Sequence, residues 1–83
     1  MKILYFASLR ARIGRAEENL LVPPDVRDVR GLLDWLGRRG ADYAAALQNR
    51  AAIRVAVNYD YVGLDHPVRQ GDEVAIFPPV TGG

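Results

Sequence analysis

The side chains that most often carry catalysis are sparse in this 83-residue chain. It has one histidine, His66, and no cysteine, and no serine lies close enough in sequence to pair with that histidine. A lone histidine next to a proline fits a turn residue and offers neither a catalytic triad nor a metal site. Asp25, Asp28 and Asp34 fall before and within a predicted helix, where they suit a cap and solvated charges rather than an acid–base pair. No glycine motif predicts a phosphate cradle. The side chains therefore predict no active site of the chain's own and no metal site.

One candidate for chemistry remains, the carboxylate of Gly83 at the end of the sequence. Pro78 and Pro79 stiffen the start of the tail, residues 78–83, which could span roughly 18–20 Å when extended. Gly82 and Gly83 have no β-carbon, so another enzyme could close around the backbone. A carboxylate becomes reactive at neutral pH as a mixed anhydride, most simply an acyl-adenylate made from ATP. The tail predicts a carrier of an activated C-terminus, and a disordered chain end is the competing interpretation.

Composition limits the other classes of function. The chain is 49% hydrophobic and 25% charged, which predicts one globular domain over residues 1–83. Its net charge of +1 offers no electrostatic reason to bind nucleic acid or an anionic membrane. The absence of cysteine rules out disulfides and thiol chemistry. The first apolar run is too short for a signal peptide or a membrane span, so we expect a cytoplasmic protein.

Two short strands are predicted near the N-terminus. The dense apolar run Ile3–Ala7 fits a strand buried on both faces, and residues 18–22 fit a second strand antiparallel to it. Residues 8–14 between them carry apolar side chains four apart. Ser8 is a candidate N-cap and Gly14 a stop signal, so one or two helical turns are expected here.

A cluster of charges lies between these strands. Arg10, Arg12 and Arg15 are basic, and Glu17 and Glu18 follow them directly. The two signs offset one another. This mixture is typical of a solvated edge.

The main helix has a clear pattern. Asp28 is a plausible N-cap, and Gly40 suits the position just after the last turn. Trp35 falls beside the apolar stripe and should flank the core, and residues 43–47 could add another helical turn. The stripe follows the i, i+3, i+4, i+7 spacing of one helix face, at Val29, Leu32, Leu33 and Leu36.

Three more strands are predicted after the helix, over residues 53–58, 61–62 and 73–77. Strands therefore flank one long helix on both sides in sequence, which is typical of an α+β protein. One helix packed across a mixed sheet of four or five strands would bury all the apolar faces. This arrangement is a β-grasp, or ubiquitin-like, fold.

At this point the residues themselves resemble a known family. The segment DHPVRQGDEVAIFPPVTGG, Asp65 to Gly83, resembles the C-terminal signature of the small subunit of molybdopterin synthase, a ubiquitin-like sulfur carrier. The opening ILYFASLRARIG and the AVN at residues 56–58 are also similar to that family. The resemblance spans essentially the whole chain. Its specific part is PPVTGG after GDEV, because every ubiquitin-like carrier shares Gly-Gly alone.

The resemblance implies a sulfur carrier in molybdenum cofactor biosynthesis, with a flexible tail and no bound cofactor. An E1-like activating enzyme would adenylate Gly83 with ATP, and a sulfur donor would convert it to a thiocarboxylate. The tail would then enter the large synthase subunit, in an expected heterotetramer, and give sulfur to the pterin precursor. Two cycles would supply one dithiolene. The chain would be a non-catalytic, sulfur-donating subunit.

The resemblance also implies roles for individual residues. Gly83 would be the covalent site and Gly82 the clearance residue, while Phe77 would be an apolar anchor in the partner interface. Arg10 would be a polar contact to the activating enzyme. Tyr61 stands where the family has an aliphatic residue. The expected partner contacts are Arg10, Tyr61, Phe77, Pro78, Pro79, Val80 and Thr81.

Two other kinds of function stay open. A related carrier for thiamine, a thiolated metabolite or tRNA, or a modifier joined to lysines, would share the Gly-Gly ending. The FPPVTGG ending favours the synthase carrier among these. A simple binding module, such as an RNA-binding β-grasp domain, is disfavoured by the near-neutral charge and by the lack of an aromatic and basic surface.

Overall fold

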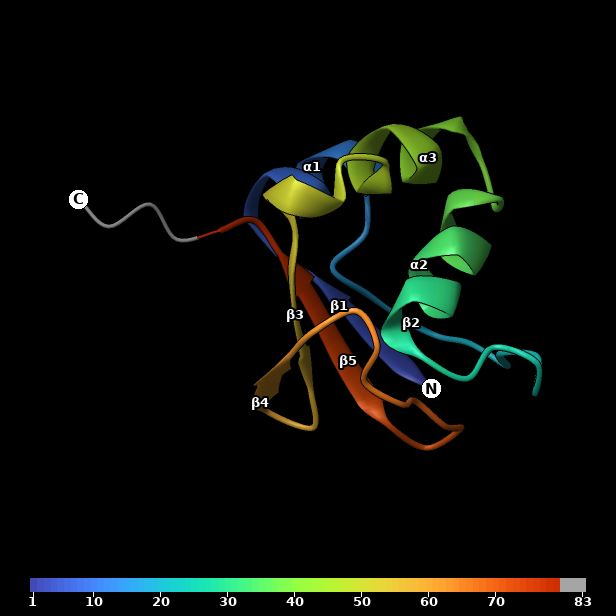
Figure 1. Ribbon diagram of the computed structural model, residues 1–83. Coiled ribbons are helices and arrows are strands. Elements are labelled where there is room, and N and C mark those ends of the chain that lie inside the picture. The colour runs from blue at the N-terminus through green and yellow to red at the C-terminus, as the bar shows by residue number, and fades with distance from the viewer. Residues whose placement is uncertain (80–83) are drawn as a thin grey trace.

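The computed structural model describes residues 1–79. Within them a five-stranded mixed sheet carries its helices on one side (Figure 1). The strands are β1 (Lys2–Tyr5), β2 (Glu17–Asn19), β3 (Arg54–Val57), β4 (Asp60–Val62) and β5 (Glu73–Phe77). The helices are α1 (Ala7–Ile13), α2 (Val29–Gly37) and α3 (Ala41–Leu47), followed by a short 3-10 turn, η1 (Arg50–Ala52).

The sheet has the order β2-β1-β5-β3-β4, which confirms the predicted β-grasp arrangement. The last strand, β5, lies in the middle, parallel to β1 and antiparallel to β3. The side chains of β5 point alternately toward the helices and away from them. Val74 and Ile76 are fully buried, whereas Ala75 and Phe77 between and after them are partly exposed.

The first strand departs from its prediction. It ends at Tyr5 rather than Ala7, and only one of its faces is buried, through Ile3 and Tyr5. Lys2 and Leu4 point to the other face and are partly exposed. The expectation of burial on both faces is wrong because the helices cover a single side of the sheet.

Strand β2 is also shorter than the predicted 18–22. It ends at Asn19, and the side chain of Gln70 then binds the backbone that follows. The Gln70 amide accepts from the Val22 backbone N–H at 3.1 Å and donates to the Leu20 carbonyl at 3.1 Å. The Leu20 backbone still bonds across to Met1, whose carbonyl accepts from the Leu20 N–H at 2.9 Å and whose amino group donates to the Leu20 carbonyl at 2.9 Å. Gln70 therefore binds the chain at the point where it leaves the sheet.

The ends of α1 confirm one prediction and correct another. Gly14 ends the helix in a left-handed conformation, φ 82°, with its N–H bound to the Arg10 carbonyl, as expected. Ser8 is not the N-cap. The helix begins at Ala7, so the cap position is at Phe6, two residues before Ser8, and no side chain caps the helix.

Helix α2 begins as predicted and ends early. The Asp28 carboxylate accepts from the Gly31 N–H at 2.7 Å, so Asp28 is the N-cap. The Arg38 and Arg39 N–H groups close the last turn on carbonyls of residues 34–36, before Gly40 is reached. Gly40, with φ 167°, is extended and begins a second full helix, α3, so its predicted role at the end of α2 is wrong.

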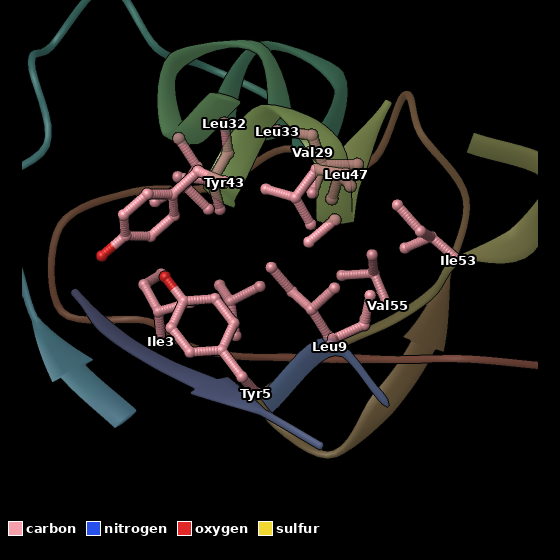
Figure 2. Packing of buried hydrophobic residues seen from close by; sticks show 14 of the residues in the cluster. Ile3, Tyr5, Leu9, Val29, Leu32, Leu33, Tyr43, Leu47, Ile53 and Val55 are labelled. Carbon is pink, nitrogen blue, oxygen red and sulfur yellow. The ribbon is translucent and has the colours of Figure 1, made fainter. Parts of the chain in front are cut away.

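The core forms between this helix face and the sheet. The predicted stripe is confirmed, because all four of its side chains are fully buried, and Trp35 packs at its edge. In Figure 2 the helical residues Val29, Leu32 and Leu33 face Ile3 and Val55 from the strands.

One charged residue belongs to this core. The Glu18 side chain is 4% exposed, because the register pairs it with Ile3 on the helix side of the sheet. Its carboxylate accepts hydrogen bonds from the hydroxyls of Tyr5 at 2.7 Å and Tyr43 at 2.8 Å, and from Arg39 at 3.3 Å. Figure 2 shows both hydroxyls directed to the same side of the cluster. The prediction of a solvated edge is therefore wrong for Glu18.

The groups of this cluster shift one another's pKa values. Burial raises the pKa of Glu18, but the hydrogen bonds from the two tyrosines and the nearby Arg39 outweigh it, so the pKa is lowered overall. Burial, and next the hydrogen bond to this carboxylate, raise the pKa of Tyr5 and of Tyr43. Glu18 is thus held as an anion and the tyrosines as neutral donors.

Candidate functional site

The tail begins at the centre of the sheet. Ile76 pairs with Tyr5 on one side and Val55 on the other, and its carbonyl also accepts from the Phe6 N–H at 3.1 Å. Phe77, the last strand residue, pairs with Arg54. Strands on both sides thus fix the position from which Pro78 starts.

A shallow hollow of about 540 Å³ lies beside this point, on the sheet face away from the helices. Its floor is Ala56 and Ala75, which are directly opposite one another on β3 and β5. Small floor residues between large rim residues make the depression. We call it the aromatic hollow, and its remaining lining residues are Phe6, Ala7, Tyr59, Tyr61, Phe77, Pro78 and Pro79.

The rim exposes large aromatic side chains to solvent. Tyr59 is 87% exposed, Tyr61 81% and Phe6 47%. The rings of Tyr61 and Phe77 pack against one another with centroids 5.6 Å apart. A cluster of exposed aromatic side chains is typical of a protein-binding surface, because tyrosine and phenylalanine bury much area there with few rotatable bonds.

The hollow lacks the groups for acid–base chemistry. Among the described residues 1–79, Tyr59 and Tyr61 are the only titratable ones that line it, and no carboxylate, histidine, lysine or arginine of that part of the chain contributes. Within residues 1–79, no three histidine, cysteine or acidic side chains come together as a metal site would require. The hollow can therefore bind apolar groups of a partner.

The structure gathers part of the predicted site. Phe77, Tyr61, Pro78 and Pro79 all line the aromatic hollow. Arg10 is exposed on α1 and does not line it. The other predicted site residues, Val80, Thr81, Gly82 and Gly83, lie outside the described residues.

Five lining residues were missed: Phe6, Ala7, Ala56, Tyr59 and Ala75. Strand alternation held a signal for one of them, since Ala75 lies two residues before Phe77 on β5. Residues two apart on a strand point to the same face. The position of Ala56 depends on the pairing of distant strands, which local patterns do not specify.

No helix within residues 1–79 has the length and apolar character needed to cross a membrane.

Comparison with known proteins decides the family. The ThiS family model matches residues 3–83. The chain belongs to the ThiS family. This ThiS family chain is 39% identical to a molybdopterin synthase sulfur carrier subunit of Escherichia coli (strain K12), over 100% of this chain and 99% of that protein. The predicted resemblance is confirmed.

Solved structures agree with the fold of this ThiS family chain. A putative molybdopterin converting factor subunit 1 from Pyrococcus furiosus superimposes with a TM-score of 0.76 at 32% identity, covering 95% of both chains. The small archaeal modifier protein 1 of Haloferax volcanii gives a TM-score of 0.73 at 29% identity, covering 96% of this chain and 97% of that one. These likenesses confirm the ubiquitin-like β-grasp class.

Proposed function

We propose that this chain carries sulfur for molybdopterin synthase, in molybdenum cofactor biosynthesis, on the carboxylate of Gly83. The observation that carries the proposal is the end-to-end likeness to a molybdopterin synthase sulfur carrier subunit. The PPVTGG ending of the sequence and an aromatic hollow at the root of the tail support it.

The proposed chemistry takes place on the backbone. An activating enzyme joins the Gly83 carboxylate to the AMP part of ATP, and pyrophosphate leaves. A donor at the oxidation level of sulfide then displaces AMP and leaves a thiocarboxylate. In the synthase this sulfur passes to the pterin precursor and water restores the carboxylate. The sulfur is carried on the main-chain carboxylate, so no thiol or metal of this chain is required.

The length of the tail limits where the partner can be. Residues 80–83 span at most about 13–14 Å from Pro79. An enzyme that takes Gly83 into its active site must therefore approach the root of the tail closely. Pro78 and Pro79 form one wall of the aromatic hollow, so that enzyme would also cover the hollow. We propose the large synthase subunit as this partner.

Mass spectrometry tests the chemical step. The protein is incubated with ATP, an activating enzyme and a sulfur donor, and the intact mass and the C-terminal peptide are measured. We expect replacement of one oxygen by sulfur at Gly83. Deletion of Gly83, or addition of one glycine after it, should abolish this replacement while the circular dichroism spectrum stays unchanged.

Gly63→Ala is the matched control. A β-carbon at Gly63 would meet no atom within 4 Å, and this glycine lies outside the hollow, so sulfur incorporation should be normal. Sulfur incorporation in the glycine-extended protein would contradict the proposal.

A modifier function is the second candidate. Its support is the likeness to small archaeal modifier protein 1 at 29% identity. In that case Gly83 would form an isopeptide bond with a lysine of another protein. Expression in the native host, followed by a search for lysines that carry the Gly-Gly remnant, distinguishes the two. Conjugates without any thiocarboxylate would favour the modifier.

A further inference from the structure

Non-glycine residues with a left-handed backbone lie at or next to the aromatic hollow. Within residues 1–79, three non-glycine residues have positive φ: Ala7 at 53°, Asn58 at 51° and Tyr59 at 73°. Ala7 and Tyr59 line the hollow, and Asn58 directly precedes Tyr59. An aromatic residue in this region of backbone space is an outlier, and such outliers concentrate at functional sites.

Tyr59 occupies a position that favours glycine. Val57 and Asp60 are the last paired residues of β3 and β4, so Asn58 and Tyr59 form a two-residue hairpin loop. Both have positive φ, the pattern of a type I′ turn, for which Asn-Gly is the preferred pair. Asn58 matches the preference. Tyr59 stands in place of the glycine.

The rest of the turn holds this conformation in place. The Asn58 N–H donates to the Glu73 carbonyl at 2.8 Å, and the Asn58 side chain accepts from the Glu73 N–H at 3.0 Å. The same side chain donates to the Asp72 carboxylate at 3.1 Å. Asn58 thus ties the loop to the start of β5, and the ring of Tyr59, 87% exposed, gains little burial from the fold.

We propose that Tyr59 is an anchor residue for the large synthase subunit, at the end of the hollow opposite the tail. This inference rests on the proposed function. Tyr59 and Pro79 line the same hollow, and the short tail brings the protein that takes Gly83 over Pro79. The partner then meets a tyrosine whose backbone conformation is already set by the turn. The large subunit would bind the Tyr59 ring in an apolar pocket, as is common for tyrosines at protein interfaces.

The test sets fold stability against binding. Tyr59→Gly removes the ring and suits the left-handed backbone, so its Tm should equal or exceed that of the wild type by up to about 8 °C. Its Kd for the cognate large subunit, measured by titration calorimetry, should rise about 10- to 30-fold. Tyr59→Phe keeps the ring, and its Kd should stay within about threefold of the wild type.

Leu21→Gly is the matched control, because Leu21 is 88% exposed but lies outside the hollow. The Kd of Leu21→Gly for the large subunit should equal that of the wild type. Tyr59→Asn, which also tolerates positive φ, should weaken binding as Tyr59→Gly does.

The outcomes separate the two proposals. If the wild-type chain does not bind the large subunit, the proposed function fails, and the role of Tyr59 fails with it. If the wild type binds and the folded Tyr59→Gly and Tyr59→Asn variants bind equally well, only the role of Tyr59 is overturned. A fall in Tm by several degrees in both variants, with unchanged Kd for the folded protein, would show that Tyr59 serves the fold and would also overturn it.

Discussion

Replacing the buried Glu18 with glutamine should strongly destabilise the fold. The substitution keeps the size of the side chain and removes its charge. Tyr5 and Tyr43 then lose an ionised acceptor for their hydroxyls, and Arg39 loses its partner at 3.3 Å. The neighbouring Glu17 is the matched control, since its side chain is 52% exposed and lies 3.5 Å from Lys2.

The magnitude follows from the contacts. Hydrogen bonds to a charged group contribute about 1.5–3 kcal/mol each, and the cost of burying the carboxylate offsets part of their sum. Glutamine can still accept one of the tyrosine hydroxyls. We therefore expect Glu18→Gln to lower the free energy of unfolding by about 2–4 kcal/mol, and Tm by about 8–30 °C. Glu17→Gln should change the free energy of unfolding by less than about 1 kcal/mol.

Urea unfolding at several pH values measures both effects, with the single tryptophan, Trp35, as the fluorescent probe. The pKa of Glu18 is lower in the folded state, so its stabilising effect is complete above the unfolded pKa of about 4.3. It is lost as the pH falls through the folded pKa. The difference between wild type and Glu18→Gln should therefore be full at pH 7 and narrow below about pH 4.

Two results would refute this reasoning. One is a Glu18→Gln variant as stable at pH 7 as Glu17→Gln. The other is a stability difference that stays constant from pH 7 down to pH 2.5, since protonated Glu18 and glutamine should be nearly equivalent.

Three further predictions concern other parts of the molecule. Ala75→Leu fills the floor of the hollow and should raise the Kd for the large subunit about tenfold or more by calorimetry, with an unchanged circular dichroism spectrum. Asp28→Ala removes the N-cap bond to Gly31 and should lower the free energy of unfolding in urea by about 1 kcal/mol. The pKa of Tyr5 is raised on folding, so the contribution of Tyr5 to stability should be constant below the unfolded pKa of about 10 and be lost above it; a free energy of unfolding that does not fall by pH 11 would contradict this.

Local patterns predicted most of the fold and only part of the site. The stripe of α2, the Asp28 cap and the strand Glu73–Phe77 each depend on residues close in sequence, and the structure confirms them. Glu18 was misjudged because its partners, Tyr5 and Tyr43, lie 13 and 25 residues away. A charge in a short strand looks the same whether its face is covered or open.

The hollow was beyond prediction for a similar reason. It exists because β3 and β5 place Ala56 opposite Ala75, and this register results from the whole sheet. Phe77 and Tyr61 were expected at a partner interface through the family resemblance. Their contact, with centroids 5.6 Å apart, and the loop that carries Tyr59 required the structure.

Side chains of β5 alternate between the two faces of the sheet, so one strand serves both the core and the hollow. Val74 and Ile76 hold it to the helices, while Ala75 and Phe77 form part of the hollow on the opposite face. A partner that binds the hollow therefore holds the strand from which the tail extends. Under the proposed function, delivery of Gly83 would then be an intramolecular event over a short tether, for which effective concentrations reach the millimolar range. A longer tail would lower that effective concentration. The central strand, the two prolines and the short tail would therefore all keep Gly83 near a partner that is bound at the hollow.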